Sequence, residues 1–302
     1  MKDNITKIVF GLFVLILILI GIVFWSGPRG GDDAAIVVEQ QQEMQVHFLN
    51  VGQGDSIYIR TPSEQDILID GGPDKNVLAE LGAVMPFWDK EIDVMVLSHP
   101  HSDHVTGLVE VLRRYKVKEI YYTGVLHTAP DYLAWLDEVK KQELDLKIVE
   151  QPFEIDFGNE VKLQFLYPRE SLVNKKIKEM NNSSIVNKLV YRDVSFLFTG
   201  DAELEVEEAL LATKDVETQN FASLRATVLK AGHHASSSSS SEEFLKAVNP
   251  ETVVIQVGAD NSFGHPHLKI LRRLERLGVE ILRNDEKGRI LITTDGQDIS
   301  FE

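Results

Sequence analysis

Residues 96–108, VLSHPHSDHVTGL, place three histidines and one aspartate within six positions at the end of an apolar run. Side chains alternate along an extended chain, so His99 and His101 point to the same side. Asp103 and His104 follow where the chain turns from strand to helix, and we expect that helix to begin at His104. The spacing therefore predicts a strand-end loop that directs two pairs of ligands at two neighbouring metal ions.

Imidazole and carboxylate ligands without thiolate favour zinc at such a centre, with manganese or iron as alternatives. The chain contains no cysteine, which excludes disulfides and lipid attachment through a cysteine. A solvated loop that happens to be rich in histidine is the alternative interpretation, but four potential ligands in so short a stretch disfavour it.

Two further segments offer ligands at the ends of apolar runs. Asp201 follows FLFTG, where a carboxylate can leave a sheet and bridge two ions, and His233 and His234 follow VLKAG. Open layered sheets present their sites at strand ends, so we expect these side chains to join the cluster around His99.

An uncharged apolar run of 18 residues, 8–25, comes close to the roughly 20 residues that cross a bilayer. It is preceded by Lys2 and Lys7 and closely followed only by Arg29, which predicts that the remainder of the chain lies outside the cytoplasm. A cleaved signal peptide is the alternative, but the small-residue cleavage pattern is missing. We therefore expect a single-pass protein of the cell membrane.

The composition along the chain predicts three parts. Residues 1–27 form the transmembrane anchor, the Gly-rich and polar residues 28–43 form a linker, and residues 44–302 form one folded domain. The formal net charge of −16 argues against a broad basic surface for nucleic acid, so an anionic substrate must be attracted locally.

Strand-like runs occur at 44–51, 56–61, 66–72 and 92–98, with a helix expected over 76–88. Later segments alternate between strand and helix patterns, and two hairpins are expected, turning at Gly158–Asn159 and at Arg192–Asp193. This order predicts a mixed α/β domain in which two sheets pack face to face and are covered by helices. The serine tract 236–241 is expected to be a loop in which Ser240 caps the following helix.

These segments resemble the metallo-β-lactamase superfamily, whose HxHxDH signature matches HPHSDH, and within it the hydrolase domain of ComEC-type competence proteins. The resemblance extends from about residue 45 to residue 295. It rests on six motifs in the same order: FLNVGQGDS, LIDGGP, LSHPHSDHVTGL, FLFTGDAE, LKAGHHASSSSS and FGHPH. It implies a four-layer αββα sandwich with two metal ions at one edge.

The resemblance also implies a role for individual residues. His99 and His101 bind one metal ion, Asp103 and His104 bind the other, and Asp201 bridges them. His234 is the expected further ligand of the second ion, with His233 facing a substrate phosphate, although the sequence alone does not order these two. Asp70 is expected to orient a ligand from behind, and Asp55 to brace the site.

Two departures from the family pattern stand out. Many members supply a third histidine to the first ion, whereas here that interval contains only His127, and NNSSIV at 181–186 stands in the corresponding place. We expect Asn182 in that stretch to contact substrate. The usual HHGS motif reads HHAS, so Ala235 replaces a glycine that a tight turn or a close approach to phosphate could require.

Other polar residues have both a functional and a structural interpretation. His265 is expected to bind a phosphate oxygen or to donate a proton to the leaving group, whereas His267 after Pro266 suits the start of a helix. Ser236 is expected to hydrogen-bond phosphate, although loop serines are often simply solvated.

We expect a membrane-anchored hydrolase in which two metal ions ionise a bridging water that attacks a phosphodiester, most simply DNA. A single membrane segment excludes a DNA-conducting channel in this chain. The alternatives are a hydrolase of small phosphoesters such as phosphorylcholine-like groups, a β-lactam hydrolase, and a catalytically silent binding module braced by metal.

Overall fold

The computed structural model describes residues 43–175, 177–212 and 224–302. The predicted membrane anchor and nearly all of the linker lie outside these residues. Within the described part of the chain, none of the helices combines the length and the apolar character needed to cross a bilayer.

Apolar residues occupy consecutive positions of the central strands, and this decides the architecture. Ile67 and Ile69 belong to one hydrophobic core, whereas Leu68 between them belongs to a second core. Phe196 and Phe198 likewise face one core, while Leu197 faces a third. Because alternate residues of a strand point to opposite faces, both faces of each sheet must be covered.

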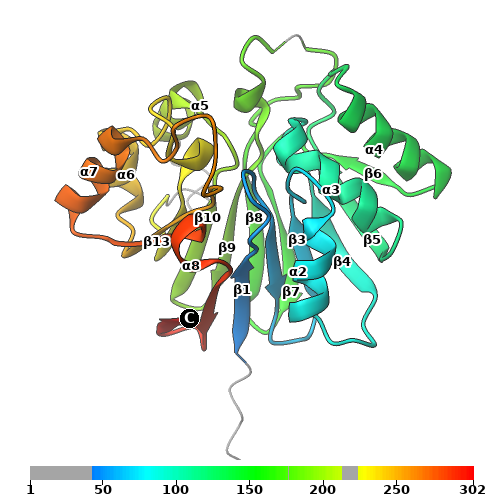
Figure 1. The fold of residues 1–302 in the computed structure, drawn as a ribbon, viewed down its shortest axis with the longest axis horizontal. Helices are drawn as coiled ribbons and strands as arrows, with labels where there is room; N and C mark the ends of the chain where they lie inside the picture. The colour runs from blue at the N-terminus through cyan, green and yellow to red at the C-terminus, as the bar shows by residue number, and fades with distance from the viewer. Residues whose placement is uncertain (1–42, 176, 213–223) are drawn as a thin grey trace, which may run out of the picture. The chain divides into compact units, whose positions relative to one another are not determined.

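The first sheet has eight strands among the described residues. Strands β3 to β6 run parallel to one another, and β1 pairs antiparallel with β14, so the start of the domain lies beside its end (Figure 1). In sheet order the strands are β15 (Ile299–Phe301), β14 (Ile290–Thr294), β1 (Met44–Phe48), β2 (Ile57–Arg60), β3 (Asp66–Ile69), β4 (Glu91–Val96), β5 (Lys116–Tyr122) and β6 (Leu146–Ile148).

The second sheet has seven strands in the described part. Strands β10 to β13 are parallel to one another, and β7 to β10 form antiparallel pairs. In sheet order they are β13 (Glu280–Arg283), β12 (Thr252–Ile255), β11 (Val228–Lys230), β10 (Val194–Phe198), β9 (Val186–Tyr191), β8 (Val161–Tyr167) and β7 (Phe153–Gly158). Both predicted hairpins, β7–β8 and β9–β10, are confirmed.

Helices cover the outer face of each sheet (Figure 1). The first sheet is covered by α2 (Asn76–Val84), α3 (Ser102–Leu112) and α4 (Pro130–Lys141), and the second by α5 (Leu204–Leu211), α6 (Glu242–Val248) and α7 (Leu268–Leu277). The short helix α8 (Asn284–Lys287) connects β13 to β14, and two 3₁₀ turns are η1 (Met180–Ser183) and η3 (Gly232–Ala235). The predicted arrangement of two sheets between helices is confirmed.

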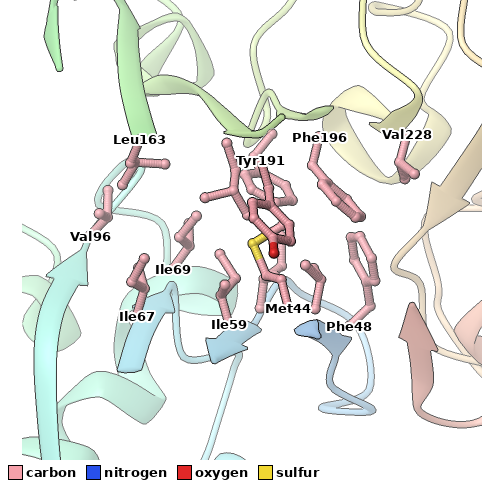
Figure 2. Close-up of a cluster of buried hydrophobic side chains, with 14 of the residues drawn as sticks. Met44, Phe48, Ile59, Ile67, Ile69, Val96, Leu163, Tyr191, Phe196 and Val228 are labelled. Carbon is pink, nitrogen blue, oxygen red and sulfur yellow. The ribbon is translucent and has the colours of Figure 1, made fainter. Parts of the chain in front are cut away.

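The largest core lies between the two sheets. Figure 2 shows Ile59 and Ile67 of the first sheet pointing toward the layer that contains Leu163 and Phe196 of the second. Burying such side chains contributes about 1.5–3 kcal/mol each relative to exposure. This core fixes the spacing of the sheets, and therefore of the loops at their edges.

Three predicted boundaries were wrong by a few residues. Helix α2 ends at Val84 instead of residue 88, because Met85 precedes Pro86 and adopts an extended conformation. Helix α3 begins at Ser102, two residues before His104, with His101 as its extended N-cap. The cap of α6 is Ser241, whose hydroxyl accepts from the Phe244 amide, and not Ser240.

Backbone hydrogen bonds join helix α3 to the loop after β3. The Gly71 amide donates to the His104 carbonyl at 2.8 Å, and the Gly107 amide donates to the Gly72 carbonyl at 3.0 Å. A Cβ atom at position 107 would collide with the Gly71 carbonyl oxygen. Glycine is therefore required here by the close approach of two backbones.

We predict that Gly107→Ala lowers the free energy of unfolding by about 2 kcal/mol or more, because backbone rather than a flexible side chain must move. Gly82→Ala in α2 is the matched control, since a Cβ there meets nothing within 4 Å. Removing a glycine from this exposed helical site should stabilise the protein by about 0.5–1 kcal/mol. Urea denaturation of both variants checks this, and equal effects would contradict the docking described.

Candidate metal centre

The predicted ligands all follow the carboxyl ends of parallel strands. His99 follows β4, Asp201 follows β10, and His233 and His234 follow β11. Strand β4 belongs to the first sheet, and β10 and β11 belong to the second. The structure therefore gathers residues from two sheets at a common edge.

His99 and His101 form the first group. His99 Nε2 lies 3.1 Å from His101 Nδ1, so both nitrogens face the same point. The Ser98 hydroxyl donates to Asp70 and thus accepts from His99 Nδ1, 3.0 Å away, which leaves His99 Nε2 with a free lone pair. Burial and the neighbouring His104 hold the pKa of His99 well below its ordinary value, so this imidazole is neutral and able to coordinate.

Asp103, His104, Asp201 and His234 form the second group, in which one ligand atom from each lies within 4.8 Å of the others. His104 Nε2 is 3.4 Å from Asp201 Oδ1, and His234 Nε2 is 3.3 Å from Asp103 Oδ2. The Nδ1 atom of each imidazole is hydrogen-bonded elsewhere: His104 Nδ1 donates to Asp70, and His234 Nδ1 donates to the Gln256 carbonyl.

Several atoms of this group lack any hydrogen-bond partner among the described residues. They are His104 Nε2, His234 Nε2 and Asp201 Oδ1, all buried. Buried polar atoms without partners are rare in folded proteins, and their convergence on one point fits a divalent cation. The donor set of imidazoles and carboxylates suits such an ion.

Charge supports the same conclusion. Burial opposes protonation of His104 and His234, but the surrounding carboxylates outweigh it and raise the pKa of both imidazoles well above the ordinary value. Burial would raise the pKa of Asp201, but His234 and His104 hold it well below the ordinary value. The carboxylates thus favour protonated imidazoles at this point, and a metal ion bound here would take the place of the protons on the Nε2 atoms.

Asp201 lies between the two groups. Its Oδ2 atom is 3.4 Å from His234 Nε2 and 4.0 Å from His99 Nε2. Its backbone amide donates to the Ser184 hydroxyl at 3.1 Å, which fixes the turn at Gly200. Asp201 therefore faces nitrogen atoms of both groups.

Asp70 lies directly behind His104. It accepts from His104 Nδ1 at 2.8 Å and from both the amide and the hydroxyl of Ser98, at 2.8 and 2.6 Å. These bonds set the orientation and tautomer of the imidazole, as the orienting carboxylates of metal sites do.

Lys230 is a residue of this site that the sequence reasoning missed. It is 1% exposed, its ammonium group contacts Asp55 Oδ2 directly, and it donates to the Gly200 carbonyl at 2.9 Å. It also lies 3.7 Å from Asp201 Oδ1, while Asp55 Oδ1 is 3.3 Å from His234 Nδ1. The available signal was its place in VLKAG, an apolar strand expected to be buried on both faces.

His233 lies on the outer side of the second group, with its side chain 23% exposed. Its Nδ1 atom is 3.1 Å from Ser238 Oγ and 3.2 Å from Glu203 Oε1. Ser236, predicted to contact phosphate, is 3.1 Å from the Ser238 hydroxyl and so belongs to the same rim. The geometry therefore distinguishes the buried His234 from the rim residue His233.

The structure does not bring Asn182 to the ligands. Its amide donates to Glu205 at 3.1 Å, and its carbonyl accepts from the Glu203 amide, so both ends are used at the start of α5. The adjacent Asn181 contacts His233 at 3.3 Å instead, and its Oδ1 atom is buried without a partner. The 3₁₀ turn η1 aims the two asparagines in different directions.

His127 lies closer to the centre than its sequence context suggested. The loop between β5 and α4 places its ring centroid 6.2 Å from that of His101. Its Nδ1 atom accepts from the Ala129 amide at 3.2 Å. Loop placement of this kind is a long-range effect that a local pattern does not encode.

The last predicted residue, His265, reaches the rim from the loop before α7. Its ring centroid is 5.4 Å from that of His233 and 6.2 Å from that of His234. Burial, reinforced by these two histidines, lowers the pKa of His265 to about 4, so its ring is neutral near pH 7. His267 is the N-cap residue of α7, as the structural interpretation predicted.

The turn after β11 has an unusual backbone. His233, His234 and Ala235 all have positive φ, at 48°, 52° and 61°. Non-glycine residues rarely adopt this left-handed conformation. Ala235 thus occupies the conformation that glycine favours, which accounts for the glycine usual at this position, and the turn separates the directions of the two histidines.

Comparison with known proteins places the chain in a family. A profile of the metallo-beta-lactamase superfamily matches residues 49–258. ComE operon protein 3 of Bacillus subtilis (strain 168) is 29% identical over 265 residues, which are 82% of this chain and 33% of the relative. Competence protein ComA of Neisseria gonorrhoeae is 29% identical over 259 residues, 83% of this chain and 32% of the relative.

The chain thus spans about a third of the length of these curated relatives. Among solved structures, the metallo-beta-lactamase fold protein YhfI from Bacillus subtilis aligns over 80% of this chain and 96% of its own, with 12% identity and a TM-score of 0.48. The match includes strands of both sheets, from β2 to β12, and every predicted ligand. The protein therefore belongs to the metallo-beta-lactamase superfamily, as the HPHSDH motif indicated.

Proposed function

We propose that this protein is a hydrolase that depends on divalent metal ions and cleaves phosphodiester bonds in nucleic acid, with single-stranded or short DNA as the substrate. Members of its family are generally metal-dependent hydrolases. The observation that carries the proposal is the convergence of unpaired buried atoms from His104, His234 and Asp201 beside the His99–His101 pair.

In this proposal the residues fall into two ligand sets. His99 and His101 would hold one ion, Asp103, His104 and His234 would hold the other, and Asp201 would contribute to both. Zinc suits these ligands, and manganese is the alternative. Asp70 and the Gln256 carbonyl keep the two second-group imidazoles in the coordinating tautomer.

When bound, the ions supply an activated water and stabilise charge on the phosphoryl oxygens. The residues of the chain orient the ligands and the substrate. Lys230 fixes Asp55 and Gly200 from behind, so Asp201 is held in place before substrate arrives. On the rim, His233, Ser236 and the neutral ring of His265 offer N–H and O–H groups that hydrogen-bond the non-bridging phosphate oxygens.

Two considerations support nucleic acid as the substrate class. The curated relatives are a ComE operon protein and a competence protein, and the matched region covers most of this chain. The formal charge of −16 then implies that attraction is confined to the site, which suits short or single-stranded substrates better than long duplexes.

We also propose that residues 8–25 anchor the domain in the cell membrane, with the catalytic part outside the cytoplasm. The uncharged run of 18 residues and the preceding lysines support this orientation.

A second candidate keeps the chemistry and replaces the substrate by a small phosphoester, such as a phosphorylcholine-like group on a surface polymer. The negative net charge of the chain favours this candidate, because a small phosphoester carries little charge outside the site for the acidic protein surface to repel.

We predict that Asp201→Asn lowers the metal content and reduces phosphodiester hydrolysis by about 10³-fold or more, because the shared negative ligand is lost. Circular dichroism should show that the fold is kept. Asp137→Asn, which removes an exposed carboxylate of α4, is the control with the same change in charge and should behave as wild type. Full metal content together with full activity in Asp201→Asn would refute the ligand assignment.

We predict that salt distinguishes the two substrate classes. For a single-stranded oligonucleotide, log kcat/KM should fall with log salt with a slope of about −0.7 to −1.4, which corresponds to one or two phosphate contacts. A small model phosphodiester should show almost no slope. If the oligonucleotide is cleaved more slowly than the model diester and shows no slope, the small-phosphoester candidate replaces DNA.

A further inference from the structure

An exposed aromatic side chain stands beside the candidate metal centre. Phe263 is 64% exposed. Its ring lies nearly parallel to that of His265, with centroids 5.8 Å apart and an angle of 23° between the planes. His265 in turn contacts the rings of His233 and His234. Phe263 is therefore separated from the metal ligands by a single imidazole.

The loop that carries Phe263 is held by hydrogen bonds on both sides of the ring. The Asn261 amide donates to the carbonyls of Gly258 and His265, at 2.8 and 2.7 Å, and its oxygen accepts from the His265 amide at 3.0 Å. Beyond it, the His267 amide donates to the Ala235 carbonyl at 3.0 Å. The side chain is thus presented from a fixed backbone.

Exposure of this ring has no structural benefit. Phe263 belongs to none of the three hydrophobic cores, and an exposed phenyl group forgoes the stabilisation that burial provides. The same loop buries the Nδ1 atom of His265 without a hydrogen-bond partner. The loop therefore places an imidazole beside His233 and His234 and an apolar ring in solvent.

We propose that Phe263 is a stacking platform for a nucleobase of the substrate, so that the site takes single-stranded nucleic acid with a base on Phe263 and its phosphate at the metal centre. This inference rests on the proposed function and names its substrate class. Phe263 lies next to His265, which lies next to His233, so a phosphate at these two histidines would have the aromatic ring within reach of its nucleoside. Stacking of a base on an aromatic side chain tolerates any sequence, because every base has a π face.

The arrangement favours a nucleic acid over a phosphorylcholine-like group. A quaternary ammonium group is recognised by aromatic rings that surround it, whereas Phe263 offers one open face backed by His265. In a duplex the bases stack on one another, so an unpaired base is the group that this face accepts.

The test compares two substrates of equal length and charge, oligothymidylate and the same backbone without bases. Kd is measured by fluorescence anisotropy, and kcat and KM are measured with Mn²⁺ or Zn²⁺, for the full chain and its Phe263→Leu variant. We expect Phe263→Leu to weaken binding of oligothymidylate by about 5- to 150-fold and to raise its KM in parallel. The preference for oligothymidylate over the abasic strand should fall by the same factor.

Two further variants complete the test. Phe263→Trp keeps an aromatic face and should retain the preference for bases. Phe87→Leu alters another aromatic residue, which is 83% exposed. Phe87 comes before the start of β4, whereas His99 and His101 follow the end of that strand. This variant should leave both substrates unaffected.

The outcomes separate the two proposals. If wild type binds both strands equally, or if Phe263→Leu leaves the preference intact, the stacking platform is refuted even when the protein cleaves DNA. If wild type cleaves neither strand but prefers oligothymidylate through Phe263 in binding, the platform stands and the hydrolytic function is refuted.

Discussion

The domain is organised around negative charge held away from water. Asp55, Asp70 and Asp201 are all nearly inaccessible, and a buried carboxylate is costly unless it is paired. Lys230 provides one fixed positive charge to this group, and His104 contributes a donor. The carboxylates also raise the pKa of His104 and His234, which adds positive charge where the two sheets meet. A metal ion bound there would replace the protons on these imidazoles.

The layered fold was predictable because its signals are local. Short apolar runs mark the strands, and the turns at Gly158 and Arg192 mark the hairpins that the structure contains. Boundaries were less predictable because they depend on details of one or two residues. Helix α2 ends where Pro86 constrains Met85, and the serine that caps α6 is decided by which hydroxyl reaches the Phe244 amide.

The candidate site divides in the same way. The HPHSDH motif predicted the proximity of His99 and His101, because two residues of an extended chain share a face. The contribution of Lys230 was hidden, since a lysine near the end of a strand is ordinarily taken as exposed. Its burial results from parallel strands on both sides of β11, and the approach of His127 to His101 likewise results from a distant loop. Such contacts depend on how distant segments pack together, and the local pattern of apolar and polar residues does not predict them.

The second group of ligands is divided between the sheets: Asp103 and His104 lie in the first turn of α3, which follows β4, and Asp201 and His234 follow β10 and β11. An ion held by both sets acts as a cross-link between the two halves of the sandwich. Its binding free energy is then also cohesion free energy for the domain. Metal bound there would add to the stability of a sandwich whose two sheets already share an apolar core, so the apo domain can stay folded while it lacks activity.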